Sequence, residues 1–511
     1  MSAQGASSLA RLTVGLLDLP ADIQVTNVTL DSRSVEPGSL FLACPGARHH
    51  GLAFAGQAIA AGARAILYEP QGADESLREA RAAARNRVVL FASVPGLAEH
   101  AGTIADRFFG EPSQFLAVAG VTGTNGKTTS AYLLAQALTI LGRTAGYIGT
   151  LGAGLPGAIE SFGLTTADVV TVHRQLAHLR SLGAECVGME VSSHALEQGR
   201  VNAVRFRAAA FTNLTRDHLD FHGSMAAYGA AKMRLFERDV AARIINVDDA
   251  FGLELAQRFA GRPGRLVVTA RRASGAQWAA AHGAEYVCAR RVEAQPEGLG
   301  LTIASSWGTT QVRLPLIGDF NADNALTVLG VLLSEDVPLA RAAAALVSCV
   351  APPGRMEKIG PARGVLAIVD YAHTPDALAN ALRAARAHCS GTLRAVFGCG
   401  GDRDPGKRPM MGRTARELAD EIIVTDDNPR TEDPRHIVAE ILEGIGSDAR
   451  VRIEHDRAAA IRDALAACAP GDVVLIAGKG HEDYQLVGRE RRPFSDQAVA
   501  RAWLEGSKGQ A

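Results

Sequence analysis

Lysine is scarce in this 511-residue chain, although arginine is abundant. Only six of its 53 Lys and Arg residues are lysine, and a genome-wide bias toward arginine codons is the simplest reason. An ammonium group and a guanidinium are nevertheless not interchangeable where a site needs a compact cation or a reactive amine. The positions that retain lysine therefore point to such sites, and they are Lys127, Lys232, Lys358, Lys407, Lys479 and Lys508.

Cysteine is also sparse, and its arrangement excludes two kinds of cross-link. The seven cysteines are odd in number, scattered along the chain and never spaced as Cys-x-x-Cys. A disulfide framework or a structural zinc site needs paired or clustered cysteines. The pattern therefore predicts reduced thiols in a cytoplasmic protein.

Long apolar runs and an excess of charge of one sign are absent. No apolar stretch approaches the roughly 18 residues that a membrane-spanning helix needs. The segment Met1 to Leu17 holds one arginine and no sustained apolar core, so we do not expect it to be a secretory signal. A net charge of −1 gives no reason to expect a nucleic-acid or membrane-surface partner.

The composition and the pattern along the chain favour a multidomain α/β protein. A hydrophobic fraction of 47% with 21% charged residues supports packed cores. At roughly 100–200 residues per domain, the length predicts about three domains. Strand-like runs alternate with Ala/Leu/Arg helical patterns, as in layers of helices on mostly parallel sheets. We expect domains at residues 1–96, 97–350 and 351–511, the last beginning in the linker at 350–354.

Several elements can be predicted from these runs. In the first domain we expect strands at 38–43 and 65–68 with a helix at 54–62 between them. A helix at 97–108 and a strand at 115–121 should open the second domain. In the third domain four strands should alternate with four helices in a doubly wound sheet. Those strands are expected at 366–370, 393–398, 421–426 and 472–477.

A candidate phosphate loop follows the strand at 115–121. Residues 122–130 read Thr-Gly-Thr-Asn-Gly-Lys-Thr-Thr-Ser and precede an apolar-periodic helix that should end near Gly142. Glycines let backbone N–H groups approach phosphate oxygens, and the helix N-terminus adds positive charge. Lys127 would reach the β- and γ-phosphates, and Thr128 would ligate magnesium. Gly120 stands one residue farther from Gly126 than the usual motif requires, but the strand–loop–helix context predicts an ATP site.

A second set of polar residues suggests where the metal binds. The run 187–191 is typical of a buried strand, and its carboxylate, Glu190, is costly there unless it serves a cation. His218 and His222 stand four residues apart, as in a zinc-binding helix, but no general-base glutamate lies between them. We therefore favour magnesium beside ATP, with Glu190 and His218 near it. Taken alone, a single histidine is more often structural.

These motifs together resemble those of the Mur ligases. They occur in order from Leu30 to Glu482 and so cover almost the whole chain. The motifs are Gly123-Thr-Asn-Gly-Lys-Thr-Thr129, Glu190-Val-Ser-Ser-His-Ala-Leu196, Asp217-His-Leu-Asp220, Gly318-Asp-Phe-Asn-Ala-Asp-Asn324, Gly354-Arg-Met-Glu357, Asp370-Tyr-Ala-His-Thr-Pro-Asp376, Asp427-Asn-Pro-Arg430 and Gly478-Lys-Gly-His-Glu482.

The resemblance implies an activity and an architecture. It implies ATP-driven amide formation in peptidoglycan precursor synthesis, by a monomer with a UDP-sugar-binding domain, a central P-loop ATPase-like domain and a Rossmann-like amino-acid-binding domain. The D-glutamate γ-carboxylate of UDP-N-acetylmuramoyl-L-alanyl-D-glutamate would be phosphorylated by ATP, and an amine of meso-diaminopimelate would attack the acyl phosphate. Four alternatives remain: L-lysine as the amine, a folylpolyglutamate synthase-like ligase, a P-loop kinase, and a non-catalytic nucleotide-binding module.

The resemblance also assigns the nucleotide and metal residues. Lys127, Glu190 and His218 would be catalytic together with Lys232, which matches a lysine that is carbamylated in the family. Taken alone, Lys232 would be an ordinary solvated helix lysine. Taken alone, Asn321 and Asn324 would be residues that cap the start of a helix. The ATP-binding residues implied are Gly123, Thr124, Asn125, Gly126, Lys127, Thr128, Thr129, Asn321, Asn324, Arg355 and Asp370. The Mg²⁺ ligands implied are Thr128, Glu190, His218 and carbamylated Lys232.

The two remaining substrates are assigned in the same way. The UDP-sugar dipeptide would contact Leu30, Ser32, Ala47, Arg48, His49, Thr165, Thr166, Ser192, Gln198 and Arg200. Ala167 and His50 depart from the family pattern, in which Pro and Asp are common at these positions; the first lies in a loop and the second beside the expected uridine pocket. Arg430 could bind the distal carboxylate of diaminopimelate bidentately, although Asn-Pro is also an ordinary turn dipeptide. The diaminopimelate contacts implied are Arg403, Asp427, Asn428, Pro429, Arg430, Gly478 and Glu482.

The glycine-rich run 397–402 lacks the Gly-x-Gly-x-x-Gly spacing of a dinucleotide-binding fold, so we do not expect NAD binding. Lys407 and Lys479 lie within motifs expected to face the active cleft. Lys358 has no predicted role, and Lys508 belongs to the tail.

Overall fold

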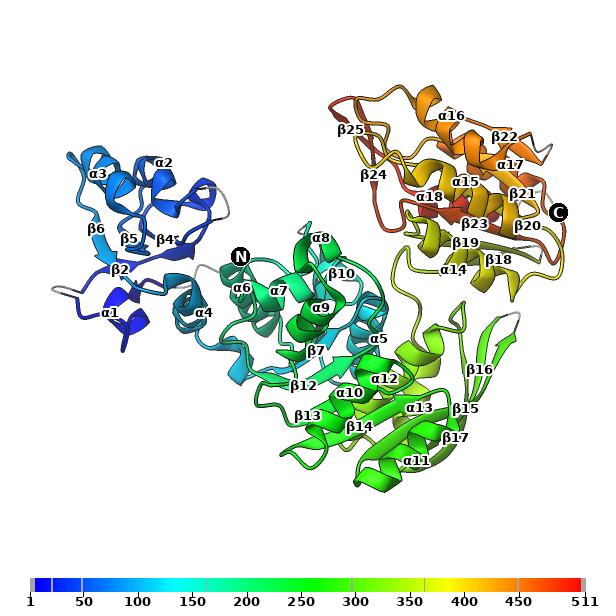
Figure 1. The fold of residues 1–511 in the computed structure, drawn as a ribbon, viewed down its shortest axis with the longest axis horizontal. Helices are drawn as coiled ribbons and strands as arrows, with labels where there is room; N and C mark the ends of the chain where they lie inside the picture. The colour runs from blue at the N-terminus through cyan, green and yellow to red at the C-terminus, as the bar shows by residue number, and fades with distance from the viewer. Residues whose placement is uncertain are drawn as a thin grey trace. The chain divides into compact units, whose positions relative to one another are not determined.

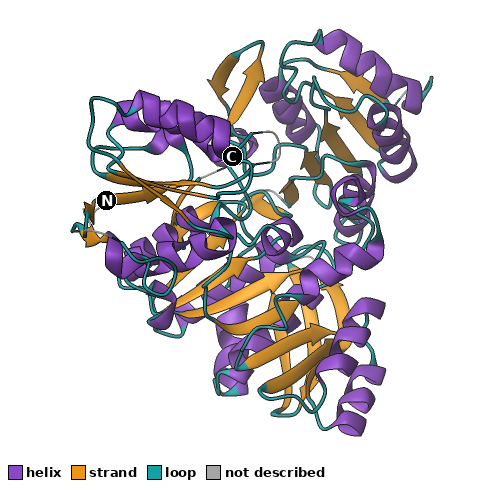
Figure 2. Cartoon of the chain, turned by 60° about the vertical axis from the view of Figure 1, so that its left-hand side comes forward, coloured by secondary structure: helices purple, strands orange, loops and turns teal. Residues whose placement is uncertain are grey.

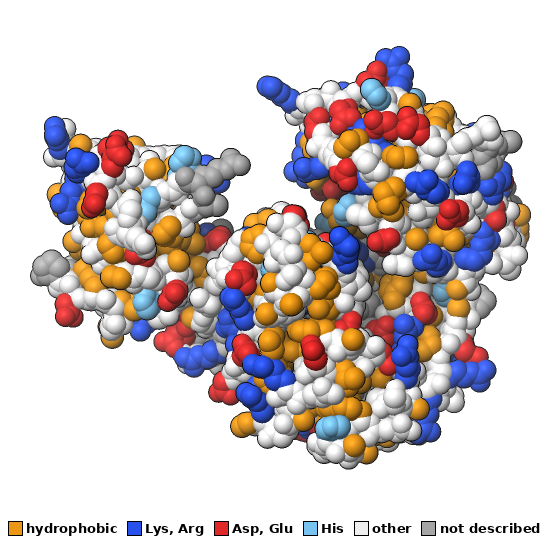
Figure 3. Space-filling model, viewed as in Figure 1, with side chains coloured by type: hydrophobic (Ala, Val, Ile, Leu, Met, Phe, Trp, Pro, Cys, Tyr) orange, Lys and Arg blue, Asp and Glu red, His pale blue; other side chains and the backbone are white. Residues whose placement is uncertain are grey.

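The computed structural model describes residues 5–506 apart from 20–21, 47–48, 162, 296, 363 and 448–449. The chain forms two compact units, Met1–Val267 and Val268–Ala511. Figure 1 traces the helices and strands along the chain from blue to red. No helix among the described residues is long and apolar enough to cross a membrane. Basic and acidic side chains are interspersed on the face drawn in Figure 3, in keeping with the net charge of −1.

The first unit begins with a small α/β layer whose sheet is parallel throughout. Its strand order is β3-β4-β5-β6. Leu40 and Leu42 of the second strand pack in one hydrophobic cluster, while Phe41 and Ala43 pack in another. Because successive strand residues point to opposite faces, helices can cover both sides. The elements are β1 (Ser7–Ser8), α1 (Leu9–Leu12), β2 (Gln24–Val25), β3 (Asn27–Thr29), β4 (Ser39–Ala43), α2 (Ala55–Ala61), β5 (Ala65–Tyr68), α3 (Asp74–Ala83), β6 (Leu90–Ser93) and α4 (Leu97–Phe108).

The rest of the first unit is built around a buried parallel sheet. Strands β8, β11, β7, β12 and β13 lie side by side in that order, and β9 and β10 extend the sheet beyond β8 in antiparallel pairs. The strands are β7 (Ala117–Thr122), β8 (Ala145–Gly149), β9 (Gly152–Leu155), β10 (Ala158–Glu160), β11 (Cys186–Glu190), β12 (Phe206–Phe211) and β13 (Ala242–Asn246). The helices are α5 (Lys127–Ile140), α6 (Val169–Ser181), α7 (Ser193–Glu197), α8 (Leu219–His222), α9 (Met225–Met233) and α10 (Ala250–Phe259).

The second unit begins with antiparallel strands. Strand β14 (Arg265–Ala270) contains the boundary between the units. Strand β15 pairs with β16, and β16 with β17, both antiparallel. Helix α12 is buried along nearly its whole length. The elements are α11 (Ala273–His282), β15 (Glu285–Gln295), β16 (Gly298–Ser305), β17 (Gly308–Leu314), α12 (Asn321–Ser334) and α13 (Leu339–Val347).

The last part of the second unit is a doubly wound six-stranded sheet in the order β18-β19-β23-β20-β21-β22. Helices α14, α15 and α16 pack on one face and α17 and α18 on the other, so that the strands are enclosed by helices (Figure 2). The strands of this sheet are β18 (Glu357–Ala362), β19 (Val365–Asp370), β20 (Leu393–Phe397), β21 (Glu421–Val424), β22 (Val451–Ile453) and β23 (Val473–Ala477). Strands β24 (Tyr484–Val487) and β25 (Glu490–Pro493) form a separate antiparallel pair. The helices are α14 (Pro375–Arg386), α15 (Lys407–Leu418), α16 (Pro434–Ile445), α17 (Arg457–Ala466) and α18 (Asp496–Gly506).

The predicted elements are found close to their expected positions. The helix expected at 97–108 is α4, and the strands expected at 38–43 and 65–68 are β4 and β5. All four strands predicted for the last domain are present as β19, β20, β21 and β23. The edge strands β18 and β22 were not predicted, and β18 runs antiparallel to its neighbour. The three-domain boundaries themselves stay a prediction.

A buried ion pair joins α17 to α18 and provides a test of the second unit's stability. Arg457 Nε and Nη2 each lie 2.8 Å from an Asp496 carboxylate oxygen, and both side chains are fully buried. Replacing Asp496 with asparagine would leave a guanidinium without its counter-charge, which typically costs about 3–5 kcal/mol. We expect urea denaturation followed by circular dichroism to show this loss. Asp463→Asn, which breaks an exposed pair with Arg452, should cost at most about 1 kcal/mol; equal losses would contradict the assignment.

Candidate functional site

The predicted phosphate loop lies at the carboxyl end of β7, immediately before α5. Gly123 and Gly126 have φ values of 150° and 84°, a region that favours glycine, and Gly126 caps the helix. The backbone N–H of Thr124 donates to Asn213 O at 2.8 Å, and that of Asn125 donates to Asn213 Oδ1 at 2.9 Å. The loop is therefore anchored to the segment that follows β12, with a helix N-terminus at its end, as anion binding requires.

Gly123 leaves no room for a side chain, which gives a direct test of the loop. A Cβ atom there would lie 1.9 Å from Thr212 Oγ1, and the φ value of 150° would add strain. In Gly123→Ala the loop must shift, and about 1–3 kcal/mol of overpacking strain corresponds to roughly 5–150-fold weaker ATP binding. We expect isothermal titration with ATP to show this weakening. Gly142→Ala, beyond the other end of α5 with nothing within 4 Å of the added atom, should bind ATP normally.

Glu190 ends β11, the strand beside β7, and its carboxylate is completely buried. Thr128 Oγ1 donates to its Oε2 at 2.9 Å, the Thr150 N–H donates to Oε1 at 2.8 Å, and the Tyr147 hydroxyl also donates to Oε1. These donors compensate for burial of the charge. A threonine hydroxyl and a carboxylate at the end of a phosphate loop are oxygen ligands that suit Mg²⁺, so these residues fit the predicted ion.

The described residues contain no group of three His, Cys, Asp or Glu side chains that could hold a metal ion. Magnesium commonly binds through one or two carboxylates together with substrate phosphates and water. Glu190 and Thr128 therefore fit a magnesium site of this kind better than they fit a zinc site. His222, the second histidine of the spacing considered above, instead contacts the Ser193 hydroxyl at 3.0 Å.

Two of the six lysines meet at the same carbonyl. Lys127 Nζ donates to Gly123 O at 3.0 Å and to Thr124 O at 2.8 Å, while Lys232 Nζ donates to Gly123 O at 2.8 Å. The Lys232 side chain comes from α9, is 1% exposed and lies with its ammonium nitrogen 4.3 Å from the centre of the Tyr228 ring. Burial, and then the charge of Lys127, hold the pKa of the Lys232 amine well below its usual value.

His218 lies on the Tyr228 side of the loop. It immediately precedes α8 with a φ of 52°, and its ring packs edge-on against His194 and Tyr228. The Tyr228 hydroxyl in turn lies 3.2 Å from Thr124 Oγ1 of the loop. Burial raises the Tyr228 pKa to about 12, although the hydrogen bond to Thr124 opposes this, so Tyr228 stays neutral.

The residues predicted to bind the muramoyl dipeptide lie together beside Glu190. Thr166 Oγ1 donates to Glu190 O at 3.0 Å, and Arg200 Nη1 donates to Thr166 O at 2.9 Å. Arg200 Nε also donates to Gln198 Oε1 at 2.9 Å, and the Ser192 N–H donates to Thr166 Oγ1 at 3.3 Å. Thr150 Oγ1 donates to Thr165 Oγ1 at 3.0 Å. Thr150 and Tyr147 were not predicted as site residues, because only the pairing of β8 with β11 brings them to Glu190.

A cavity of about 640 Å³ opens where uridine binding was predicted. Leu30 and Ser32 line it, and Ser32 Oγ donates to Gln57 Oε1 at 2.9 Å. His49 packs edge-on against Phe54, another lining residue. Ala47 and Arg48 lie outside the described residues. The other lining residues are Thr29, Asp31, Arg33, Ser34, Gln57, Asp168, Val170, Thr171 and Arg174.

His50, one of the two departures from the family pattern, caps a short helical turn. Its Nδ1 accepts from the Leu52 N–H at 3.1 Å, and its Nε2 lies 3.0 Å from Glu69 O. An aspartate at this position would cap the turn in the same way. His50 therefore preserves the local turn next to the cavity.

In the second unit, the residues predicted to bind diaminopimelate lie on three loops at the carboxyl ends of β20, β21 and β23. The Gly401 N–H donates to Asn428 O at 2.9 Å, and Arg430 Nη1 donates to Gly401 O at 2.7 Å. Asn428 Nδ2 donates to Glu482 Oε2 at 2.9 Å. Ligands of open α/β sheets bind at this edge. Pro429, Asp427, Gly478 and Arg403 lie on the same loops.

Hydrogen bonds hold the side chains of three residues predicted to bind the nucleotide in the second unit, Asp370, Asn321 and Asn324. Asp370 accepts from the Met356 N–H at 2.8 Å and the Ala372 N–H at 2.9 Å, and burial raises its pKa while Arg355 lowers it. Asn321 Nδ2 donates to Ile317 O at 2.7 Å, and Asn324 Nδ2 to Asn321 Oδ1 at 2.7 Å. Neither asparagine is the helix cap, since Phe320 occupies that position without a side-chain bond.

Comparison with known proteins agrees with this arrangement. Family models described as "Mur ligase family, catalytic domain", "Mur ligase middle domain" and "Mur ligase, glutamate ligase domain" match residues 24–108, 121–332 and 354–480. A protein of Xanthomonas campestris pv. campestris (strain 8004) is 48% identical over 484 residues, covering 94% of each chain; it is named UDP-N-acetylmuramoyl-L-alanyl-D-glutamate–2,6-diaminopimelate ligase. The chain belongs to the Mur ligase family.

Other Mur ligases support the same conclusion. A protein of the same name from Pseudomonas aeruginosa is 46% identical over 476 residues, covering 93% of this chain and 94% of its own. A solved structure of a UDP-N-acetylmuramoyl-L-alanyl-D-glutamate–2,6-diaminopimelate ligase has a TM-score of 0.70 at 32% identity and covers 99% of this chain and 100% of its own. The predicted Mur ligase fold, with mixed α/β layers and parallel sheets, is confirmed.

Proposed function

We propose that the chain joins meso-diaminopimelate to the D-glutamate γ-carboxylate of UDP-N-acetylmuramoyl-L-alanyl-D-glutamate, with ATP converted to ADP and phosphate. The observation that carries the proposal is that Glu190 contacts both the end of the phosphate loop and the residues predicted to bind the dipeptide. Its carboxylate accepts from Thr128 beside the phosphate loop, and its carbonyl accepts from Thr166 among the predicted dipeptide residues. The relatives named for this reaction share nearly half of the residues over almost the full length.

The chemistry follows from two obstacles. A carboxylate is a poor electrophile, and an amine at neutral pH is mostly protonated. The loop 123–129 would hold the ATP phosphates, and Lys127 would neutralise charge as the γ-phosphoryl group moves to the γ-carboxylate. The resulting acyl phosphate is attacked by the amine, which loses a proton, and phosphate leaves. Phosphoryl transfer of this kind depends mainly on positioning and charge.

Magnesium supplies further charge neutralisation when bound, and Thr128, Glu190, His218 and a carbamate on Lys232 would hold it. The carbamate is proposed because Lys232 is buried and its pKa is well below the usual value. A neutral amine can attack CO₂, forming an N–C bond and releasing a proton. The anion produced would lie beside Lys127 and could support the metal, which an arginine could not do.

Selectivity for diaminopimelate is assigned to the second unit, and to Arg430 first. Its backbone is fixed by bonds from Arg430 N–H to Leu486 O at 3.0 Å and from Gly488 N–H to Arg430 O at 2.7 Å. A guanidinium so placed could bind the distal carboxylate, which lysine lacks. We expect Arg430→Ala to raise KM for diaminopimelate roughly 10–100-fold, as the loss of a charged hydrogen bond implies. Arg489→Ala, on the nearby hairpin turn, is the control, and an unchanged KM in Arg430→Ala would contradict the placement.

Each of the three predicted domains would bind one substrate. Residues 1–96 would bind the UDP-sugar, 97–350 ATP, and 351–511 the amino acid. Asn321, Asn324, Arg355 and Asp370 would contact the nucleotide. A monomer in the cytoplasm, acting in peptidoglycan precursor synthesis, is proposed, and the seven free cysteines support a reducing compartment.

One assay tests the proposed function. The protein is incubated with ATP, magnesium and UDP-N-acetylmuramoyl-L-alanyl-D-glutamate, and with either meso-diaminopimelate or L-lysine. We expect the tripeptide product and stoichiometric phosphate only with diaminopimelate. Phosphate release without incorporation of an amine would exclude a ligase, and equal use of lysine would exclude the proposed specificity.

A further inference from the structure

Lys479 is completely buried at the point where two loops of the second unit meet. Its Nζ donates to Asn428 Oδ1 at 3.0 Å and to Glu482 Oε2 at 3.2 Å, and it lies 3.9 Å from Asp427 Oδ1. Asp427 and Asn428 follow β21, whereas Glu482 follows β23. One ammonium group therefore links the two loops that carry most of the predicted amino-acid-binding residues. The motif was expected to face the cleft, and its lysine side chain is buried between these two loops.

The bonds around Asn428 fix the direction of its amide. Its Oδ1 accepts from both Lys479 Nζ and the Leu486 N–H, the latter at 2.9 Å, so its Nδ2 must point the other way. That Nδ2 donates to Glu482 Oε2 at 2.9 Å. The same carboxylate oxygen thus receives bonds from Lys479 and Asn428, which leaves its partner Oε1 for other ligands. Three donors on a compact ammonium suit this set of acceptors better than a planar guanidinium would.

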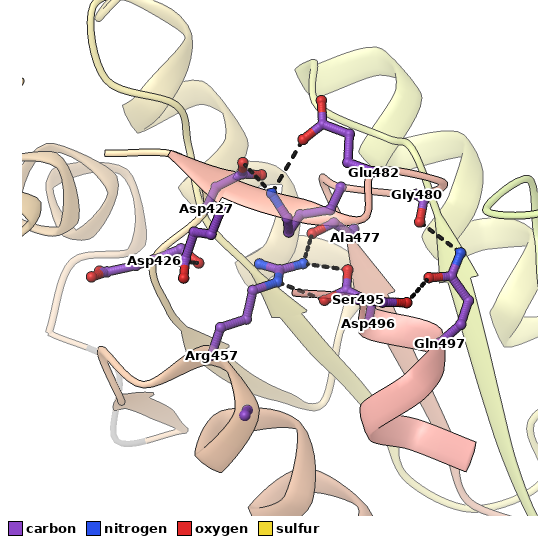
Figure 4. A network of polar contacts seen from close by, with 12 residues as sticks. Asp426, Asp427, Arg457, Ala477, Gly480, Glu482, Ser495, Asp496 and Gln497 are labelled. Atoms are coloured by element: carbon purple, nitrogen blue, oxygen red, sulfur yellow. Dashed lines mark hydrogen bonds and ion pairs between the residues drawn. The ribbon is translucent and has the colours of Figure 1, made fainter. Parts of the chain in front are cut away.

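A second buried cation lies beneath the same acidic group. Arg457 is paired with Asp496 and with Ala477 O at 2.9 Å, and its Nη1 has no hydrogen-bond partner among the described residues. Figure 4 shows Asp427 and Glu482 on the side of this network away from Asp496. Burial raises the pKa of Asp427, while Arg457 and then Lys479 lower it. The two cations thus favour the charged form of a carboxylate that is otherwise poorly solvated.

Gln497 and Gly478 hold the loop after β23 in place from other sides. Gln497 Nε2 donates to Gly480 O at 2.7 Å (Figure 4). A Cβ atom at Gly478 would lie 2.4 Å from Asp427 Oδ2, so the two loops are in close contact. These contacts hold the loop backbone in place. The Lys479 side chain extends from this backbone and donates to Asn428 and Glu482.

We propose that Lys479 is a positioning residue of the amino-acid site: it orients Glu482, directly and through Asn428, so that the Glu482 carboxylate binds the ammonium end of the incoming amino acid, which Lys479 itself does not touch. This inference rests on the proposed function, because it assumes that these residues bind diaminopimelate. It also explains the lysine itself. In a chain that uses arginine almost everywhere, a fully buried cation with two hydrogen-bond acceptors and a nearby carboxylate on two loops retains the compact ammonium.

The test measures KM for each substrate in Lys479→Met and Lys479→Arg. We expect Lys479→Met to raise KM for diaminopimelate roughly tenfold or more, the effect typical of removing a group that orients a ligand-binding side chain. KM for ATP and for the UDP-dipeptide should stay the same. Lys479→Arg keeps the charge but not the geometry, and its KM for diaminopimelate should lie between those of the wild type and Lys479→Met. Lys358→Met, a half-buried lysine on β18, is the control and should behave as the wild type.

The outcomes separate the two proposals. If the wild type does not incorporate diaminopimelate, the proposed function fails; if it does but Lys479→Met has an unchanged KM for diaminopimelate, only the positioning role fails. A purely structural role would lower the active fraction, and hence the apparent kcat, without a selective rise in this KM. If Lys479→Met does not fold, Lys479→Arg decides, and an unchanged KM there overturns the inference.

A double-mutant cycle tests the route through Glu482. If Lys479 acts by orienting Glu482, then Lys479→Met should add little to the effect of Glu482→Gln on KM for diaminopimelate. Independent, multiplicative effects of the two substitutions would overturn this route.

Discussion

Glu190→Gln will lower kcat roughly 10²–10³-fold, the loss typical of removing one preorganised electrostatic contact at a reacting centre. The substitution keeps the shape of the side chain but removes the negative charge. Glutamine also places an amide N–H₂ among hydrogen-bond donors, since Thr128, Thr150 and Tyr147 all donate to Glu190 now. The variant would thus lose its attraction for a cation at the end of β11 and gain a buried donor–donor conflict.

The measurement is steady-state ligation at several magnesium concentrations. We expect the apparent magnesium requirement of Glu190→Gln to rise together with the loss of kcat, because a ligand of the ion is removed. Glu185→Gln, an exposed glutamate just before the same strand, should match the wild type. A Glu190→Gln enzyme with normal kcat and normal magnesium dependence would show that this carboxylate does not serve the metal.

Lys232→Met will lower kcat by roughly 10²-fold or more, and Lys232→Arg will not restore it. The amine lies 2.8 Å from Gly123 O, and its low pKa leaves a larger neutral fraction at neutral pH than an exposed lysine has. Only a neutral amine can add CO₂. Arginine would instead place a permanent guanidinium in a buried position next to Lys127.

Carbon dioxide provides the specific readout for Lys232. We expect wild-type activity to fall in CO₂-depleted buffer and to return with bicarbonate. Bicarbonate labelled with the NMR-active carbon isotope should give a carbamate resonance in carbon NMR spectra. Lys232→Met should show neither response, whereas Lys358→Met should show both. Full activity of Lys232→Arg would contradict a carbamate role.

The sequence was most informative where local chemistry dictates structure. The loop 123–126 was identifiable because glycines, a lysine and a following apolar helix occur together, and the structure places them between β7 and α5. The buried strand carrying Glu190 was predicted from its apolar run and is β11. Helix α4 was found at its predicted limits because it has a clear apolar stripe and begins after Gly96.

The features that the sequence did not reveal depend on distant parts of the chain. Strand β18 contains Gly360 and Pro361 and becomes a strand by pairing with β19. The short β22 lies at a sheet edge and has an exposed residue pattern, so it lacked an apolar signal. The burial of Lys479 depends on the meeting of two loops that are about fifty residues apart, from Asn428 to Lys479. Thr150 and Tyr147 become neighbours of Glu190 only through the pairing of two strands.

The most direct test of the central claim follows oxygen from the dipeptide carboxylate. UDP-N-acetylmuramoyl-L-alanyl-D-glutamate is prepared with both γ-carboxylate oxygens labelled with the heavy oxygen isotope, and is incubated with ATP, magnesium and meso-diaminopimelate. If the γ-carboxylate is activated as an acyl phosphate, each molecule of amide formed must release one phosphate that carries one labelled oxygen. Mass spectrometry of the phosphate should show this ratio. Amide formation with unlabelled phosphate, or labelled phosphate without amide, would contradict the account.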